Sequence, residues 1–260
     1  MHITLEGKIA LVTGGSGGIG KAIAEALAAS GAQVAISYSS HPEPAHATVK
    51  EIEAKGGKAI AVLADVGDPA AVQTMFDQVA EQLGPLDILI NCAGIDGKRA
   101  PSWEIAIDDW RKVIEVNLFG TFHASQLALK AMVARRSGVI LNITSVHDTI
   151  AWSGYSAYTS SKAAVAMLTK TMAQEAAPFG VRVLALAPGA IQTDINKAVW
   201  DDKEQLKDLL GKIPLGRMGT AEDVAGMAVV LVSDVGAYVT GTTLFVDGGM
   251  TDYPEFAHGG

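Results

Sequence analysis

Short apolar runs alternate with segments of helical periodicity along the whole chain of 260 residues. The runs expected to form strands are 8–12, 33–37, 59–63, 86–91, 138–143, 182–186 and 243–246. The segments expected to form helices are 21–30, 46–55, 69–83, 109–135, 157–177 and 221–231. Strands that are apolar on both faces and separated by helices indicate a parallel sheet covered on both sides. The sequence therefore predicts a doubly wound, Rossmann-like α/β fold that binds ligands at the carboxyl ends of its strands.

The composition fits one domain that spans residues 1–260. Hydrophobic residues make up 49% of the chain and charged residues 18%, which supplies a large core and is too little charge for a disordered chain. The chain contains no internal repeat and no linker rich in Pro, Ser or charge. We therefore expect a single folding unit.

The charge balance and the cysteine count exclude several classes of function. The net charge of −8 is unfavourable for binding nucleic acid or an anionic membrane. No apolar run is long enough to span a membrane and no signal peptide is visible, so we expect a cytoplasmic protein. The single cysteine, Cys92, excludes an intrachain disulfide and a multi-cysteine metal site, and we expect no metal.

A glycine-rich loop, residues 13–20, lies between the first apolar run and the first helical segment. Its glycines allow the backbone to turn tightly and to approach a pyrophosphate, and the helix that follows offers free N–H groups to phosphate. The spacing Gly14-x-x-x-Gly18-x-Gly20 is not Gly-x-Gly-x-x-Gly, and no Gly-Lys-Ser/Thr follows as in a P-loop. An ordinary strand–helix turn is the alternative. The position of the loop favours a dinucleotide site.

This loop resembles the Thr-Gly-x-x-x-Gly-x-Gly loop of the short-chain dehydrogenase/reductase family. Segments along nearly the whole chain match the same family, namely Asp65-Val66, Asn91-Cys92-Ala93-Gly94, Asn117, Pro188-Gly189-Ala190-Ile191-Gln192-Thr193, 238–241 and 247–249. Cys92 replaces an Asn of the family turn, and we interpret it as a buried small residue without a redox role. The resemblance implies cofactor contacts from Gly14, Ser16, Gly18, Ile19, Gly20, Asp65, Val66, Asn91, Ala93, Gly94, Tyr158, Lys162, Pro188, Gly189, Ile191 and Thr193.

The spacing of Ser145, Tyr158 and Lys162 predicts a catalytic set. Tyr158 and Lys162 are four residues apart and lie on one helix face, and Ser145 ends the fifth apolar run. Tyr155 has no lysine four residues on, so it does not fit the same role. Each residue alone is compatible with a surface or cap position, but the three together, behind the glycine-rich loop, indicate catalysis. The resemblance adds Asn117 as part of a proton relay to Lys162.

The residue types explain the expected chemistry, which is hydride transfer between a substrate alcohol or carbonyl and a nicotinamide. A phenol has a pKa of about 10 and is a poor base at neutral pH. A nearby lysine ammonium and an oxidised nicotinamide favour the phenolate, which then accepts the proton of a substrate hydroxyl. Ser145 is expected to hydrogen-bond the reacting oxygen, and Lys162 to hold the nicotinamide ribose.

The end of the second strand predicts the choice of cofactor. An acidic residue at this place binds the ribose 2′-OH of NAD and repels a 2′-phosphate. The chain instead has Tyr38, Ser39 and Ser40, whose hydroxyls suit a phosphate, although Gly17 occupies a position where NADP-using relatives often carry Arg. We expect NADP to be preferred and NAD to be usable.

The segment that follows Ser145 and the C-terminal tail, 245–254, resemble bacterial glucose 1-dehydrogenases of the family. The residues that could bind the hydroxyls of an aldose substrate or form an apolar wall are Asp96, Ser145, His147, Trp152 and Asn196. His147 and Trp152 are equally compatible with packing within the loop. The polar segment 195–211 is expected to be a substrate lid.

Two other functions remain open. A 3-oxoacyl-carrier-protein reductase would share the catalytic residues, but its acidic partner requires a basic rim for which only Arg135-Arg136 is a candidate. A catalytically silent NAD(P)-sensing protein would not need all of Ser145, Tyr158 and Lys162. We also expect a homotetramer, because segments 109–135 and 157–177 carry apolar residues on more than one face.

Overall fold

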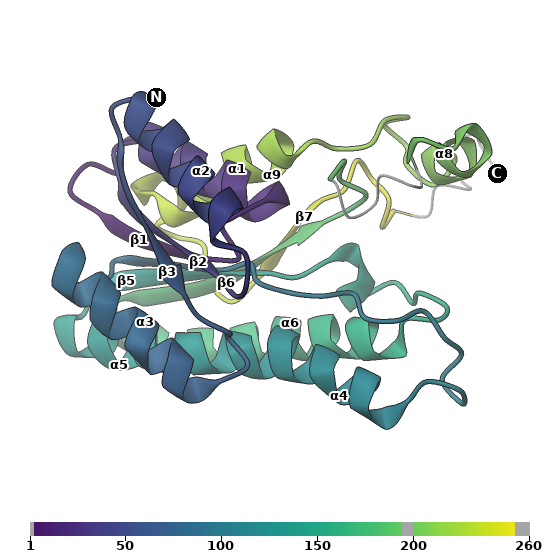
Figure 1. Ribbon diagram of the computed structural model, residues 1–260, viewed down its shortest axis with the longest axis horizontal. Coiled ribbons are helices and arrows are strands. Elements are labelled where there is room, and N and C mark those ends of the chain that lie inside the picture. The colour runs from purple at the N-terminus through teal and green to yellow at the C-terminus, as the bar shows by residue number, and fades with distance from the viewer. Residues whose placement is uncertain (1–2, 194–199, 253–260) are drawn as a thin grey trace.

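The computed structural model describes residues 3–193 and 200–252 and forms one seven-stranded sheet between two layers of helices (Figure 1). The strands are β1 (Ile9–Thr13), β2 (Gln33–Tyr38), β3 (Lys58–Leu63), β4 (Ile88–Asn91), β5 (Gly138–Ile143), β6 (Val181–Pro188) and β7 (Thr243–Val246). They lie in the order β3-β2-β1-β4-β5-β6-β7, and every neighbouring pair is parallel. The predicted doubly wound α/β fold is confirmed.

Helices cover both faces of the sheet (Figure 1). The helices are α1 (Gly18–Ala29), α2 (Pro42–Ala54), α3 (Pro69–Gln82), α4 (Ile107–Ile114), α5 (Gly120–Arg135), α6 (Ser156–Ala176), α8 (Lys203–Leu210) and α9 (Ala221–Val232). Helices α1, α2 and α9 lie on one face, and α3 to α6 lie on the other. Successive residues of β1 enter opposite core clusters, Ala10 and Val12 on the α1 side, Ile9 and Leu11 on the α5 side. This double burial explains why the strands are continuously apolar.

The chain reverses direction across the sheet between β1 and β4. From β1 the chain proceeds outward to β2 and β3, whereas from β4 it proceeds the opposite way to β5, β6 and β7. Thr13 at the end of β1 pairs with Asn91 at the end of β4. The connections after these two strands therefore diverge, and a crevice for a ligand opens at the carboxyl edge of the sheet.

Helix α2 begins four residues before the predicted start at position 46. Pro42 is in its first turn and Pro44 follows two residues later, both ahead of the segment predicted to be helical. The first N–H groups of a helix have no intrahelical acceptor, so a proline there removes no hydrogen bond and its fixed φ suits the helix. The prolines thus begin the helix instead of preventing it.

The helix predicted over 109–135 is interrupted near its centre. A π-helical turn, Glu115–Phe119, separates α4 from α5. The wider turn places Asn117 inward, where it is buried, and the Thr121 hydroxyl donates to the Asn117 carbonyl over 2.8 Å. Such insertions are frequent at functional sites because they redirect one side chain without ending the helix.

The segment predicted as a lid is partly helical. Helix α8 occupies 203–210, and the Asp202 carboxylate caps it by accepting from the N–H groups of Glu204 and Gln205. Residues 194–199, which include the candidate Asn196, lie outside the described residues. Within the part of the chain that the structure describes, no helix has the length and apolarity to cross a membrane.

Candidate active site

The glycine-rich loop joins β1 to α1 at the crevice. The Thr13 hydroxyl accepts from the N–H groups of Cys92 and Ala93 over 3.0 and 3.1 Å, so it ties the end of β1 to the turn after β4. Gly14 and Gly18 have φ angles of 67° and 51°, in the left-handed region. A Cβ on Gly14 would lie 2.9 Å from the Ala93 Cα. The loop therefore admits only glycine at this close approach.

A cavity of about 510 Å³ extends from this loop to the start of α6. One wall is the loop with the N-terminus of α1, and the opposite wall is the segment after β6. A Cβ on Gly18 would lie only 3.5 Å from the Thr193 Cγ2, which shows how closely the two walls approach. The predicted cofactor residues that line the cavity are Gly14, Ser16, Gly18, Ile19, Gly20, Ala93, Gly94, Tyr158, Lys162, Pro188, Gly189, Ile191 and Thr193.

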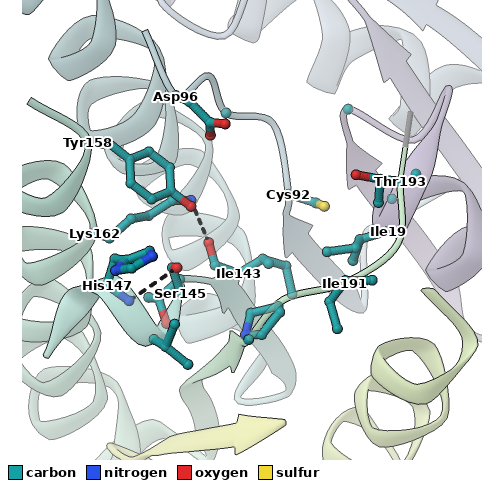
Figure 2. A pocket seen from close by; sticks show the side chains of 18 of the residues that line it. Ile19, Cys92, Asp96, Ile143, Ser145, His147, Tyr158, Lys162, Ile191 and Thr193 are labelled. Atoms are coloured by element: carbon teal, nitrogen blue, oxygen red, sulfur yellow. Dashed lines mark hydrogen bonds between the residues drawn. The ribbon is translucent and has the colours of Figure 1, made fainter. Parts of the chain in front are cut away.

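Tyr158, Ser145 and Lys162 converge at the far end of the cavity (Figure 2). The Ser145 side chain lies close enough to the phenol of Tyr158 to lower the pKa of that phenol. The Lys162 ammonium lies 5.6 Å from the centre of the Tyr158 ring and donates to the Ile143 carbonyl over 2.9 Å. Because Ile143 ends β5 and Ser145 follows two residues later, this bond fixes α6 beside the strand that carries Ser145.

Asn117 connects the π-helical turn to the same site. Its amide nitrogen donates to the Ile95 carbonyl and to the Ser161 hydroxyl over 2.9 and 3.0 Å. Its amide oxygen accepts from the Ile95 N–H over 2.8 Å. A Cβ on Gly94 would meet both the Asn117 Oδ1, at 3.3 Å, and the Lys162 Nζ, at 3.5 Å. Asn117 and Lys162 therefore flank the same glycine.

The candidate substrate residues lie around Tyr158. Asp96 and His147 line the cavity, and Figure 2 shows them on either side of the Tyr158 and Ser145 pair. The Ser145 hydroxyl accepts from the His147 N–H over 3.2 Å, and the His147 Nδ1 lies 3.1 Å from the Ile150 carbonyl. Burial raises the pKa of Asp96 and lowers the pKa of His147.

Trp152 lies in a stack of three aromatic rings beside this site. Its ring centre is 4.5 Å from that of His147 and 3.9 Å from that of Tyr155, with interplanar angles of 10° and 24°. The Tyr158 ring meets Trp152 edge-on at 6.0 Å. His147 and Trp152 pack within their loop and also line the cavity, so their contact with a substrate stays a prediction.

Six predicted cofactor residues do not line the cavity. Tyr38 ends β2, and Ser39 and Ser40 follow it. The ring centres of Tyr38 and His46 are 6.2 Å apart. Three more are engaged by protein groups, namely Asp65, Val66 and Asn91.

The contacts of these three residues explain their placement. The Asp65 carboxylate accepts from the Gly67 N–H over 2.9 Å and pairs with Lys112 over 3.4 Å. Val66 packs on Gly120, where an added Cβ would lie 2.6 Å from it. The Asn91 side chain is 3% exposed and points into the core. The Asn91 side chain therefore bonds other core groups and does not line the cavity.

Comparison with known proteins identifies the family. A family model described as enoyl-(acyl carrier protein) reductase matches residues 14–251. The 3beta-hydroxysteroid dehydrogenase 1 of Eggerthella lenta is 46% identical over 260 residues, which cover 100% of this chain and 99% of the relative. The glucose 1-dehydrogenase 2 of Bacillus subtilis is 43% identical over 98% of this chain and 99% of its own length. A 3-oxoacyl-(acyl-carrier-protein) reductase of Staphylococcus aureus is 42% identical over 94% and 98%, respectively.

A crystal structure of a gluconate 5-dehydrogenase from Burkholderia cenocepacia, in complex with NADP and tartrate, superposes with a TM-score of 0.91. It is 37% identical and covers 96% of this chain and 98% of its own. The chain belongs to the short-chain dehydrogenase/reductase family. This dehydrogenase is accordingly an NAD(P)-dependent oxidoreductase that acts on CH–OH groups.

The cavity of the dehydrogenase fits a dinucleotide. Gly17, the N-cap of α1, makes no side-chain capping bond, so the helix N-terminus offers unpaired N–H groups beside the glycine-rich loop. A Cβ at Gly14 would meet the Ala93 backbone and a Cβ at Gly20 would meet the Gly14 backbone, so these glycines allow the tight turn that forms this wall of the cleft. The opposite end of the cavity carries Tyr158 and Lys162. Pyrophosphate at the loop and nicotinamide at Tyr158 thus match the shape and the donor groups of the cleft.

The acid–base balance of the site differs in one respect from the expectation. Burial raises the pKa of Tyr158 to about 12, and the nearby Ser145 side chain opposes this only in part. Burial also lowers the pKa of Lys162. On balance the side chains of the dehydrogenase favour the neutral phenol, and the positive charge of an oxidised nicotinamide would add to that of Lys162 in favouring the phenolate.

The sequence analysis did not assign Cys92, Thr144 and Met250 to the site, although they line the cavity. Burial raises the pKa of the Cys92 thiol to about 11, which agrees with an unreactive side chain. Met250 is placed by Asp247, whose carboxylate accepts from the N–H groups of Gly249 and Thr251. Only the fold brings this distant tail to the cavity. In the described ranges, 3–193 and 200–252, no cluster of acidic, His and Cys residues could hold a metal ion.

Proposed function

We propose that this dehydrogenase oxidises a neutral polyhydroxylated substrate of the aldose type at a CH–OH group, with NADP as the preferred hydride acceptor. The observation that carries the proposal is the pair Asp96 and His147, two half-buried polar groups that line the substrate end of the cavity on either side of Tyr158 and Ser145. Buried polar groups in a site discriminate strongly against substrates that leave them without partners.

The hydrogen bonding of His147 makes its free ring nitrogen an acceptor. A carbonyl oxygen can only accept, so the Nδ1 atom that lies 3.1 Å from the Ile150 carbonyl carries the proton. Burial lowers the pKa of His147, which favours the neutral ring. The remaining Nε2 then has a lone pair and no proton. It suits a substrate hydroxyl and not a carbonyl or a carboxylate.

Asp96 adds a second acceptor to the site. When its carboxylate is ionised it accepts hydrogen bonds from hydroxyls and repels an anion. Two acceptors beside the reacting oxygen therefore favour a polyol. The same charge disfavours an aldonate, the substrate type named for several structurally similar dehydrogenases.

The residues of the catalytic set divide the chemistry of oxidation. Bound nicotinamide supplies the hydride acceptor. Ser145 hydrogen-bonds the reacting oxygen, and Tyr158 accepts the hydroxyl proton as the C–H bond of the same carbon transfers its hydride. Lys162 would hold the ribose of the bound cofactor, and its ammonium adds positive charge near Tyr158. Asn117 orders the Ile95 and Ser161 groups around the proton path. In the reverse direction the neutral phenol donates its proton to a carbonyl.

The preference for NADP rests on the absence of an acid at the end of β2, where Tyr38 is followed by Ser39 and Ser40. Replacing Tyr38 with Asp should shift the ratio of kcat/KM toward NAD by about tenfold, because a carboxylate repels the 2′-phosphate and binds the 2′-hydroxyl. Ser39→Ala and Ser40→Ala should weaken NADP more than NAD. A Tyr38→Asp enzyme with an unchanged ratio would contradict this interpretation of the loop.

A substrate panel tests the proposed function directly. The purified enzyme is assayed by nicotinamide absorbance with aldoses, gluconate, a 3β-hydroxysteroid and an acetoacetyl thioester, each with both cofactors. Oxidation of an aldose in preference to the others is the expected result. Brisk NADPH oxidation by the thioester would assign the enzyme to acyl reduction, turnover of the steroid would assign it to sterol oxidation, and NADPH binding without turnover would favour a sensing protein.

Asp96→Asn provides the matched test of the acceptor argument. We expect kcat/KM for the aldose to fall about tenfold and the ratio of gluconate to aldose activity to rise, because the repulsive charge is gone. Asp77→Asn, on the exposed surface of α3, is the control and should change neither value. An Asp96→Asn enzyme with unaltered discrimination would argue against a neutral polyol.

A further inference from the structure

A chain of buried amide and hydroxyl groups crosses the core beneath the active site. The Asn91 Nδ2 donates to the Asn142 Oδ1 over 2.8 Å, and the Asn142 Nδ2 donates to the Thr169 hydroxyl over 2.8 Å. The Thr169 hydroxyl in turn donates to the Val165 carbonyl over 2.8 Å. Asn142 and Thr169 are completely buried, and Asn91 is 3% exposed. These groups link β4, β5 and α6 through side chains alone.

The Val165 carbonyl, the last acceptor, fixes which group donates and which accepts along this chain of hydrogen bonds. Because the Val165 carbonyl can only accept, the Thr169 hydroxyl must give its proton there and offer a lone pair to Asn142. Asn142 then presents its NH₂ group to Thr169 and its oxygen to Asn91. The Asn91 NH₂ group also donates to the Ser125 hydroxyl on α5 over 2.9 Å. One threonine hydroxyl thus orients two buried amides.

This chain of hydrogen bonds reaches the helix that carries Lys162 at one end and the turn that lines the cofactor cavity at the other. Thr169 lies two helical turns after Lys162, so both side chains face β5. They attach α6 to adjacent residues of that strand, Lys162 to the Ile143 carbonyl and Thr169 to the Asn142 side chain. At the other end, Asn91 immediately precedes the turn that lines the cofactor cavity.

We infer that Asn142 and Thr169 are positioning residues that set the place of α6 along β5, and with it the approach of Tyr158 to Ser145 and to the cofactor turn. Apolar packing holds α6 against the sheet, but packing has no fixed register, and the Lys162 bond is a single polar attachment of the helix to β5. A second attachment two turns away, to the adjacent residue of the strand, fixes that register. The inference rests on the proposed roles of Tyr158 and Ser145 and not on the identity of the substrate.

The consequence is a loss of catalytic geometry when the hydroxyl is removed. Thr169→Val keeps the shape of the side chain but leaves the Asn142 NH₂ group buried without an acceptor, so the amides reorient or the helix moves. A displacement of about 1 Å in a reacting group can cost roughly a hundredfold in rate. Cofactor binding at the glycine-rich loop should be affected much less.

The experiment compares four full-length enzymes: wild type, Thr169→Val, Thr169→Ser and Thr171→Val. Thr171 lies on the same helix, donates to the Met167 carbonyl and is exposed, which makes Thr171→Val the matched control. With any substrate that the wild type turns over, we expect Thr169→Val to lower kcat between about tenfold and a hundredfold and to leave KM for NADP within about twofold. The deuterium isotope effect on kcat should rise. Thr169→Ser, which restores the hydroxyl, should recover activity.

The pH profile supplies a readout that a purely structural role would not move. The nearby Ser145 side chain lowers the pKa of Tyr158, so a Tyr158 that lies farther from Ser145 should shift the oxidation profile toward higher pH. The charged and titratable groups that face Tyr158 are Lys162, Asp96, Cys92, Asp148 and His147. None of them is altered by the substitution.

Several results would overturn the inference. Thr169→Val with kcat and pH profile equal to those of Thr171→Val would do so even if it melts earlier, and so would a Thr169→Ser enzyme as impaired as Thr169→Val. If Thr169→Val does not fold, Thr169→Cys takes its place, because a thiol is a weak acceptor and should give an intermediate kcat. A crystal structure of the variant in which α6 keeps its place on β5 would also contradict the inference. Activity in Tyr158→Phe would instead refute the proposed function.

Discussion

Tyr158 is subject to opposing influences on a single phenol. Burial raises its pKa to about 12, whereas the nearby Ser145 side chain lowers it. Burial lowers the pKa of Lys162, and its ammonium donates one hydrogen bond to the Ile143 carbonyl. The residue thus begins as an acid suited to donate a proton to a carbonyl. Its use as a base depends on the charge that the oxidised cofactor brings.

Removing the phenolic oxygen tests this assignment. Tyr158→Phe should lower kcat by at least about 10²–10⁴-fold, because general acid–base catalysis contributes this much and no other side chain occupies the position. NADPH binding, measured by fluorescence titration, should survive. Tyr155→Phe is the control, since it keeps its stacking on Trp152 and lies outside the proton path. Near-normal turnover in Tyr158→Phe would refute the role.

The raised pKa of Tyr158 also gives the two directions of reaction different pH profiles. Oxidation needs the phenolate, so its kcat/KM should increase with pH between about pH 6 and 9. Reduction needs the neutral phenol, which predominates below a pKa of about 12, so its kcat/KM should stay level over the same range. Initial rates in both directions at constant ionic strength check this. A reduction rate that falls from pH 6 upward would indicate another acid.

At the scale of elements, the start of α9 supports the cofactor segment after β6. The Gly219 N–H donates to the Ala190 carbonyl and the Gln192 N–H donates to the Gly219 carbonyl, each over 2.9 Å. Thr220 follows at the N-cap of α9 and forms a capping box with Asp223. The helix start and one wall of the cavity are therefore a connected piece of structure.

Thr220→Ala should destabilise this piece by about 1 kcal/mol, the usual effect of losing an N-cap side chain. The Arg217 guanidinium lowers the pKa of Asp223 to about 2. The contribution of the Asp223 carboxylate to the free energy of unfolding is therefore fully present above its ordinary pKa, and it is lost as the pH falls through about 2. Chemical denaturation of the variant and of Thr74→Ala, an exposed mid-helix control, measures the difference. Equal losses in the two variants would contradict a specific cap.

At the scale of the whole molecule, large apolar side chains are exposed on the helices that cover one face of the sheet. Ile107 and Met167 are each 60% exposed and Phe119 is 50% exposed, all on the side of α4, α5 and α6. Figure 1 shows these helices together on one face of the sheet. Exposed large apolar side chains of this kind are typical of protein–protein interfaces. We propose that this face joins copies of the chain in a homotetramer.

Light scattering should give a mass near four times the 27.0 kDa of one chain. Met167→Glu should lower the mass, because it places a charge in the proposed contact without an opposite partner. Leu63→Glu replaces an equally exposed residue at the edge strand β3 and should leave the mass unchanged. A wild-type mass of one chain at micromolar concentration would refute the assembly.

The sequence by itself determined how strands and helices alternate along the chain, where the glycine-rich loop lies and how the catalytic residues are spaced. These are local properties, since apolar runs set the strands, positive φ angles require glycine, and a four-residue interval places Tyr158 above Lys162. Only the tertiary structure decided the π-helical turn that turns Asn117 inward, the burial that raises the pKa of Tyr158, and the arrival of Met250 at the cavity. Each of these features depends on residues that are distant in sequence, because the burial of a side chain is set by the elements that pack against it in the folded protein.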